Sequence, residues 1–344
     1  MSRITMKDVA RQAGVSQPTV SHVINGTASI SGNVTRKVNK AIEQLGYLPN
    51  AAARSLKKNT SNIVGLIVPS VDMRFYGELV KVIERILRRE GYITFLCNTF
   101  YNGHLEKEYV ETLIQNNVIG VISGSDIVDE KSYSLLINNH ISTVLLDTQK
   151  KLEGMFSVQV DNEQIARLAV SHLYDTGARK ISYCSEPIAT SMLQTRYECF
   201  THAMKEFGLT LHKNQCFFAQ NQCNNHSKIE MGYDVAANVL LQDDIDAVFA
   251  SSDEFAYGII SRFKEHEIDI PGQIQIMGCD NDPFSNLITP SLTTLQQPIS
   301  LMAEIGVNML LRLINDQSLN ERSKCLEPSI IIRESTKNIS TRKN

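Results

Sequence analysis

Apolar residues recur at helical spacing along the first fifty residues of the chain. Between Ser16 and Asn25 the apolar side chains fall on one face of a short helix, and the polar side chains fall on the other. Ser16 suits the helix N-cap because its hydroxyl can accept the backbone N–H of Thr19, and Pro18 lies in the first turn, where a missing N–H costs nothing. The pattern predicts an amphipathic helix whose outward face carries small polar side chains.

A second short helix is predicted immediately upstream, over residues 5–13. Thr5 is its N-cap, and Asp8 occupies the position of the acidic residue in a capping box. Gly14 stands where a left-handed C-terminal residue belongs, so the chain turns sharply before the next helix. Two short helices joined by a glycine turn predict a helix-turn-helix DNA-binding motif, although an ordinary αα-hairpin has the same outline.

The next segments complete a small headpiece. A third helix is predicted from Gly32 to Leu45, with Ser31 as its cap and Gly46 as its stop. Residues 50–58 are rich in alanine and prone to form a helix, but only a short one. Isolated helices of about two turns are marginal in water because nucleation is unfavourable, so this segment should fold only with a partner.

From Ile63 the pattern changes to short apolar runs that alternate with helical segments. The predicted strands are residues 63–69, 93–98, 118–123, 143–147, 181–184, 216–219, 247–251, 274–278, 293–297 and 329–333. The predicted helices are residues 76–89, 106–116, 131–139, 165–176, 196–207, 229–242, 257–266 and 302–314. This alternation predicts βαβ units and parallel sheets covered on both faces. The expected fold is a small all-α helix-turn-helix headpiece followed by an α/β body of two lobes with a cleft between them.

The net charge of −3 hides a segregation along the chain. Residues 1–60 carry nine lysines and arginines against two carboxylates, a charge of +7, which leaves −10 for the remainder. A basic arm on an acidic body predicts a polyanionic partner for the arm alone. A merely solvated basic face would have the same composition, but the helix-turn-helix pattern inside this arm favours DNA.

Several other classes of function find no support in the sequence. No signal-peptide segment and no apolar run of membrane-spanning length occurs, and the seven cysteines form no CxxC pair, which is typical of reduced thiols in a cytoplasmic protein. Cys216, Cys223 and His226 lack the spacing of a zinc site. There is no GxSxG, no P-loop, and no GxGxxG after the first strand. We therefore expect no membrane association, no metal, no cofactor and no enzymatic activity.

Polar residues follow the predicted strands of the body. They are residues 70–76, Asp147, residues 186–196, Ser252, Asp253 and residues 280–282. Ligands of open α/β sheets bind beyond the carboxyl ends of the strands. Carboxylates can accept pairs of sugar hydroxyls, arginine is a rigid fork of donors, and Phe75 and Tyr76 offer flat apolar area to a ring. This mixture predicts a polyhydroxylated ligand in the cleft.

The first sixty residues resemble the headpiece of the lactose-repressor (LacI/GalR) family of transcription regulators. The matching residues are Met6-Lys7-Asp8-Val9-Ala10, Ala13-Gly14-Val15-Ser16, Thr19-Val20-Ser21-His22-Val23-Ile24-Asn25, Leu45-Gly46-Tyr47-Leu48-Pro49-Asn50 and Ala53-Arg54-Ser55-Leu56. Weaker similarity continues to the C-terminus. One departure is Val34-Thr35-Arg36, since the family usually has Thr-Arg one residue earlier.

The resemblance implies a domain organisation. It gives a DNA-binding headpiece over residues 1–47, a hinge helix over 48–61, and a periplasmic-binding-protein-like body over 62–344 for effector binding and dimerisation. The chain should cross between the lobes three times. The first lobe would comprise about residues 62–161 and 295–325, and the second about 162–292 and 326–337.

The resemblance also implies a function: a dimeric repressor that binds double-stranded operator DNA under the control of a sugar or sugar derivative. Residues implied in DNA binding are Thr5, Ser16, Gln17, Pro18, Thr19, Ser21, His22, Asn25, Asn50, Ala53, Leu56 and Lys57. The second helix would read base edges in the major groove. In the family the hinge helix pairs with its dimer mate and wedges a leucine, here Leu56, into the minor groove.

For the effector, Arg196 and Asp280 match positions that contact the small molecule in most family members. Other effector or lobe-closure contacts fall near Phe75, Tyr76, Asp147 and Asp253. Thr190 and Met192 stand where the purine-responsive member has the arginine and threonine that hold the base, which argues against a purine.

Two other interpretations remain open at this point. The polar residues of the cleft could simply cap helices and serve turns, as Asp253 and Asp280 could. A sugar-binding transport protein would share the two-lobed body. Such a protein would need an export signal and would not need a basic helix-turn-helix arm, and the sequence shows the opposite of both.

Overall fold

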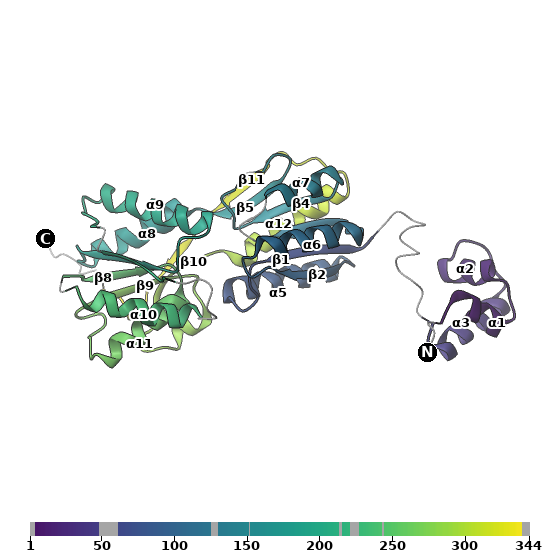
Figure 1. The fold of residues 1–344 in the computed structure, drawn as a ribbon, viewed down its shortest axis with the longest axis horizontal. Helices are drawn as coiled ribbons and strands as arrows, with labels where there is room; N and C mark the ends of the chain where they lie inside the picture. The colour runs from purple at the N-terminus through teal and green to yellow at the C-terminus, as the bar shows by residue number, and fades with distance from the viewer. Residues whose placement is uncertain are drawn as a thin grey trace. The chain divides into compact units, whose positions relative to one another are not determined.

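The computed structural model describes residues 4–47, 61–124, 130–150, 152–212, 215–220, 227–242 and 244–338. The chain divides into two compact units, Met1–Ser61 and Asn62–Asn344 (Figure 1). The hinge positions Asn50, Ala53, Leu56 and Lys57 lie outside the described residues.

The first unit contains three short helices, α1 (Met6–Ala13), α2 (Gln17–Asn25) and α3 (Gly32–Leu45), as predicted. Their ends are set by local chemistry. The carboxylate of Asp8 accepts the backbone N–H of Thr5 at 2.9 Å, and Ser16 accepts the N–H of Thr19 at 3.3 Å. Each helix ends at a glycine in the left-handed region, where the lack of a Cβ avoids a steric penalty. The core of the unit is formed by Val9, Ala10, Ala13, Val20, Val38, Ala41 and Tyr47.

The second unit contains two six-stranded sheets, one in each lobe. The first has the order β11-β5-β4-β3-β1-β2, and all its strands are parallel. Its strands are β1 (Ile63–Val68), β2 (Ile93–Asn98), β3 (Gly120–Ser123), β4 (Ser142–Leu146), β5 (Phe156–Val160) and β11 (Ser323–Leu326). Four helices pack on it: α5 (Arg74–Arg89), α6 (Gly103–Gln115), α7 (Glu130–Asn138) and α12 (Ile299–Ile314).

The second sheet has the order β12-β10-β9-β8-β6-β7, with β12 antiparallel to β10. Its strands are β6 (Ile181–Ser185), β7 (Cys216–Phe218), β8 (Ala247–Ala250), β9 (Gln275–Cys279), β10 (Thr293–Gln296) and β12 (Ser329–Ile331). Its helices are α8 (Asn162–Asp175), α9 (Ser191–Glu206), α10 (Lys228–Leu240) and α11 (Asp253–Glu265), and a 3-10 turn, η2 (Pro283–Asn286), follows β9.

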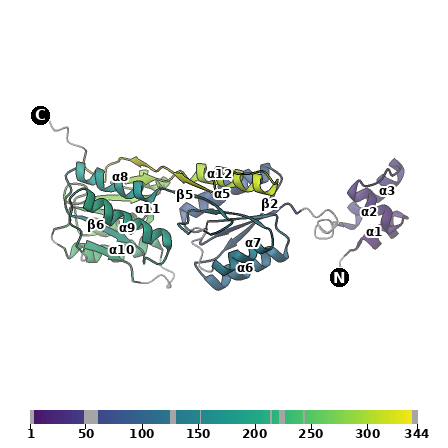
Figure 2. The same ribbon diagram turned by 90° about the horizontal axis from the view of Figure 1, so that it is seen from above.

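The side chains of each sheet alternate between two cores, as the period of a strand requires. In β1, Val64, Leu66 and Val68 face α5 and α12, whereas Ile67 packs with α6 and α7 on the opposite face. Figure 2 shows these two pairs of helices on opposite sides of the first sheet. The predicted doubly covered α/β architecture is therefore confirmed.

The chain passes between the lobes three times, after β5, after β10 and after β11. Strand β10 lies wholly in the second sheet, so the chain returns to the first lobe at α12. Two strands were not predicted from the sequence, β5 and β11. Strand β11, Ser-Lys-Cys-Leu, lies at the edge of its sheet and is mostly exposed, so it carries no apolar run. Strand β5 next to it is only half-buried at several positions.

None of the helices that the structure describes combines the length and the apolar character needed to cross a membrane.

Candidate functional site

The candidate DNA-reading surface is the outward face of α2. Gln17 and Pro18 are exposed at its N-terminal end, and His22 and Asn25 are half-buried further along. The ring nitrogen Nδ1 of His22 lies 2.9 Å from the hydroxyl of Thr27, just beyond the helix. The amide of Asn25 donates to the carbonyl of Ser21 at 2.8 Å. The helix therefore holds two of its polar side chains by short local hydrogen bonds, while Gln17 projects into solvent.

Other candidate contacts surround this face. Thr5 caps α1, and Ser16 and Thr19 share a hydroxyl–hydroxyl hydrogen bond of 2.8 Å. The exposed basic residues of the described headpiece are Lys7, Arg11, Arg36, Lys37 and Lys40. Arg11 also pairs with Asp8 at 3.5 Å on the exposed side of α1.

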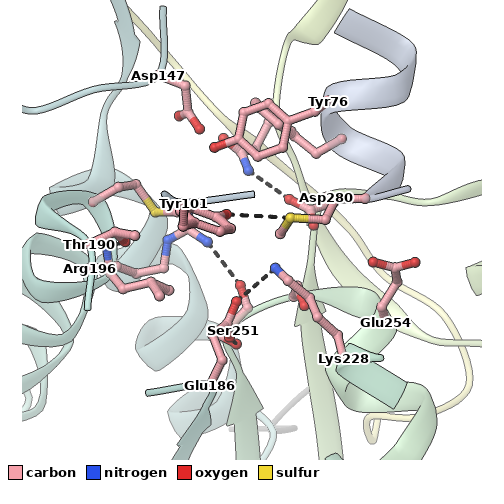
Figure 3. A pocket seen from close by; sticks show the side chains of 16 residues that line it. Tyr76, Tyr101, Asp147, Glu186, Thr190, Arg196, Lys228, Ser251, Glu254 and Asp280 are labelled. Atoms are coloured by element: carbon pink, nitrogen blue, oxygen red, sulfur yellow. Dashed lines mark hydrogen bonds and ion pairs between the residues drawn. The ribbon is translucent and has the colours of Figure 1, made fainter. Parts of the chain in front are cut away.

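The second candidate site is a pocket in the body, lined from both lobes (Figure 3). It is lined by Met73, Phe75, Tyr76, Tyr101, Asp147, Glu186, Thr190, Met192, Leu193, Arg196, Lys228, Ser251, Ser252, Glu254, Asp280 and Gln297. The space among them is about 40 Å³, which is room for only a few water molecules. Ligands of open α/β sheets bind beyond strand ends, and Asp147, Glu186, Ser251, Asp280 and Gln297 each follow a strand directly.

Arg196 is the most deeply buried charged residue of the pocket. It comes from α9, and only 2% of its surface is exposed. Its Nε donates to Asn162 Oδ1 at 3.0 Å, and Nη1 donates to the carbonyl of Ser251 at 2.9 Å. These bonds fix the plane of the guanidinium, so its remaining N–H groups have a defined direction.

Two aspartates of the pocket sit on unusual backbone. Asp147 has φ +53° directly after β4, and Asp280 has φ +130° directly after β9. Non-glycine residues rarely adopt these angles, and such strain tends to persist at ligand sites. Gln297 Nε2 donates to Asp280 Oδ1 at 2.7 Å, while its buried Oε1 lacks a hydrogen-bond partner among the described residues. Burial raises the pKa of Asp280 to about 6, even though Lys228 and Arg196 oppose that shift.

The apolar wall comes from the first lobe. Phe75 and Tyr76, in the first turn of α5, are both nearly buried and lie edge to face with centroids 5.1 Å apart. The hydroxyl of Tyr101 donates to Met73 Sδ at 3.4 Å, and burial raises the pKa of Tyr101 to about 12. Thr190 lines the pocket and also caps α9, because its hydroxyl accepts the N–H of Leu193 at 3.2 Å.

Six of the seven effector residues named from the sequence thus meet in one pocket, and Asp253 does not line it. The side chain of Asp253 is fully buried between α11 and the strand ends. Its carboxylate accepts the N–H of Asp282 at 2.8 Å and the hydroxyl of Ser285 at 2.6 Å, and it also accepts from Thr294. These bonds tie η2 to α11.

Four residues of the pocket lining, Tyr101, Lys228, Glu254 and Gln297, were not predicted from the sequence, whereas Glu186 falls within the predicted segment 186–196. Tyr101 and Gln297 lie just past β2 and β10, so the rule about strand ends could have found them. Lys228 carried no such signal, because it opens a helix ten residues after β7 ends.

A helix-turn-helix unit joined to a two-lobed α/β body with a polar pocket defines a class of protein: the ligand-responsive DNA-binding regulators. Comparisons with known proteins agree. Residues 5–50 match the model of bacterial regulatory proteins of the lacI family, and residues 170–336 match that of the periplasmic binding protein-like domain.

The HTH-type transcriptional repressor PurR of Pasteurella multocida is 34% identical over 338 residues, which cover 97% of this chain and 98% of that protein. The chain belongs to the LacI family of bacterial regulatory proteins, and it is a transcription regulator rather than an enzyme.

The similar solved structures include two with a bound sugar. A periplasmic binding protein/LacI transcriptional regulator from Alkaliphilus metalliredigens, complexed with D-xylulofuranose, is 29% identical with a TM-score of 0.71; the match covers 81% of this chain and 100% of that one. A LacI family regulator from Enterococcus faecium, with bound ribose, is 26% identical with a TM-score of 0.72, covering 80% and 98%.

Proposed function

We propose that this protein is a repressor that binds operator DNA as a homodimer, and that a carbohydrate held between the lobes of its body controls that binding. The pocket carries the proposal: Arg196 faces Asp147 and Asp280 across a small polar space with aromatic side chains at its wall. Guanidinium donors and carboxylate acceptors together complement the hydroxyls of a sugar. The sugar complexes of the two similar regulators support the same ligand class.

Control of DNA binding would come from the position of the pocket between the two lobes. A ligand that contacts Arg196 of one lobe and Tyr76 of the other can favour one arrangement of the lobes over another. A ligand shifts a conformational equilibrium only through its different affinity for the two states. Because such coupling is reciprocal, an inducer binds the DNA-free protein more tightly by the factor by which it weakens operator binding.

The effector is testable by thermal shift of the purified protein with a panel of sugars, sugar derivatives and purine bases. We expect a sugar to raise the unfolding midpoint and to change operator affinity in a fluorescence anisotropy assay. Stabilisation by purine bases but by no sugar would contradict the proposal.

On the DNA side, the exposed side chain of Gln17 and the half-buried side chain of His22 on the polar face of α2 support base readout by these two residues. Replacing both by Ala should remove the preference for operator over random duplex and leave nonspecific binding largely intact.

Operator affinity should fall steeply with salt, since neutralised phosphates release counterions. Leu56→Ala should reduce both affinity and DNA bending. A flat salt dependence would contradict the proposed interface.

An exposed apolar edge supports the homodimer. Strand β2 is at the end of the first sheet, and its side chains Ile93, Phe95 and Leu96 are 53%, 39% and 46% exposed. Monomeric proteins usually protect such edges with charge or cover. Analytical ultracentrifugation of Ile93→Lys/Phe95→Lys, with Ile137→Lys at another exposed apolar position as control, should show dissociation only for the edge variant.

A further inference from the structure

A buried ion pair forms part of the pocket wall, between Lys228 and Glu186. Lys228 Nζ lies 2.7 Å from Glu186 Oε1, and their side chains are only 18% and 10% exposed. The other oxygen of Glu186 accepts from Ser185 at 3.2 Å and from Ser251. Both members line the pocket, and Figure 3 shows the ammonium of Lys228 reaching toward Glu186.

Lys228 does not stabilise the helix α10 in which it lies. Lys228 is the first residue of α10, and a cation at a helix N-terminus opposes the helix dipole. Burial and the position in the helix both disfavour the charge, and Glu186 offsets them. Burial alone would raise the pKa of Glu186, but the charge and hydrogen bond of Lys228, helped by Ser251, lower it to about 2. Both side chains are therefore charged at neutral pH.

The charges of the described pocket lining favour an uncharged ligand. Four carboxylates, Asp147, Glu186, Glu254 and Asp280, face the two cations Arg196 and Lys228, a formal charge of −2. Protonation of Asp280 would reduce this to −1. A phosphate brought into the pocket would add negative charge beside buried carboxylates, where charge repulsion is only weakly screened.

Three of the helix N-termini around the pocket, those of α9, α10 and α11, carry side-chain caps, whereas the N-terminus of α5 at Met73 has none. Thr190 accepts the N–H of Leu193, and Ser252 accepts that of Phe255. Ser227 and Glu230 form a capping box on α10. At each of these three termini, a side-chain oxygen already accepts one of the N–H groups that an anion at an open helix terminus would use.

We propose that the effector is an uncharged polyhydroxylated molecule rather than a phosphorylated sugar, and that Lys228, neutralised by Glu186, is a specificity-determining donor to one of its hydroxyls. This inference rests on the proposed function. An ammonium has three donors, and Glu186 takes one of them. Pairing removes the net charge that would attract a phosphate but leaves N–H groups for a hydroxyl oxygen.

The test is titration calorimetry of the full-length protein with matched ligands, namely ribose and ribose 5-phosphate, glucose and glucose 6-phosphate, and galactose and galactose 6-phosphate. We expect the sugar that binds to lose at least about tenfold in affinity on phosphorylation, since one uncompensated charge contact is worth more than about 1.4 kcal/mol in a desolvated site.

Two variants separate charge from hydrogen bonding. Glu186→Gln leaves the lysine uncompensated, so the preference for the neutral sugar should shrink about tenfold or reverse. The double variant Glu186→Gln/Lys228→Met keeps the pocket charge of the wild type. It should therefore retain the discrimination against phosphate but bind the neutral sugar about tenfold more weakly, because a donor is lost. Circular dichroism and operator binding check that each variant is folded.

Tighter binding of a phosphorylated sugar by the wild type would overturn this inference and leave the proposed carbohydrate effector in place. If Glu186→Gln kept the full preference for the neutral over the phosphorylated sugar, the ion pair would not determine this specificity. Failure of every carbohydrate to bind would overturn the proposed function together with the inference.

Discussion

The headpiece and the pocket of the body are both polar surfaces built from a handful of side chains, but they are assembled differently. In the headpiece, the hydrogen bonds that cap α1 and hold the side chains of α2 join residues at most five positions apart, such as Thr5 to Asp8 and His22 to Thr27, and one longer-range bond runs from Gln12 to Gln44 at 3.4 Å. In the pocket, Arg196 donates to groups 34 and 55 positions away in the sequence. The DNA-reading surface is specified locally, whereas the ligand site depends on the whole body.

This difference has a consequence for mutation. A substitution in the headpiece should act within its own helix, because the partners are close in sequence. A substitution at the pocket should be felt by elements far apart in the chain, since one side chain joins several of them. Four predictions test this contrast.

The largest effect is expected for Arg196→Ala, which removes the central donor of the pocket. Effector affinity should fall at least about 100-fold, because the acceptors of the ligand and those of Asn162 and Ser251 lose a charged partner in a buried site. Operator affinity without effector should stay within about threefold. Calorimetry and anisotropy measure the two quantities, with exposed Arg179→Ala as a control. Wild-type effector affinity in Arg196→Ala would place the ligand elsewhere.

Glycines offer a matched comparison between the two regions. A Cβ on Gly258 would lie 2.0 Å from the carbonyl oxygen of Ile229, so Gly258→Ala must push α10, and with it Lys228, away from α11. The free energy of unfolding of the body should fall by about 1–3 kcal/mol or more, and Gly258→Asn should be worse.

At Gly14 the space is open and only φ, +65°, opposes a side chain. Gly14→Ala should destabilise the headpiece by about 1–2 kcal/mol, and Gly14→Asn by less, since Asn tolerates the left-handed region. Denaturant unfolding with separate probes on the two units would measure both. If Asn were the better replacement at both sites, the contrast between steric and conformational causes would be wrong.

The pH dependence of stability should differ between the units as well. Burial, together with the charge of Asp280, raises the pKa of Asp253 to about 7. The folded body therefore holds a proton that the unfolded chain releases near pH 4, so this group makes the body less stable as pH rises from about 4 to 7. Asp253→Asn should remove most of that slope in denaturant titrations at several pH values. If the slope were unchanged in this variant, other titrating groups would cause the pH dependence. Asp280 is one such group, because its pKa is also raised in the folded body.

The smallest effect is expected from the helix caps. Ser16→Ala should cost the headpiece about 1 kcal/mol and leave the body unchanged. Ser227→Ala, at the equivalent position of α10, should affect the body alone. Unfolding curves of the full-length protein followed by probes in each unit would show whether the losses stay in the unit that carries the cap.

The sequence by itself determined the headpiece almost completely. Its helices, caps and glycine stops depend on hydrogen bonds over three to five residues, and these can be read from residue types such as Thr5, Ser16 and Gly46. It also determined the class of the body, because strands buried on both faces give apolar runs that recur with regular helices between them. Strand β11 was not predicted, because an exposed strand at the edge of a sheet needs no apolar run.

Only the tertiary structure decided which polar residues share the pocket. Parallel strands bring their carboxyl ends to one edge of a sheet, so Asp147 and Asp280 could be expected there in advance. Whether a side chain enters the pocket depends on contacts made elsewhere. Asp253 is held by η2 and strand β10 instead. Lys228 is brought to Glu186 because Gly232 and Gly258 let α10 and α11 approach closely, a packing contact between segments that the local pattern does not encode.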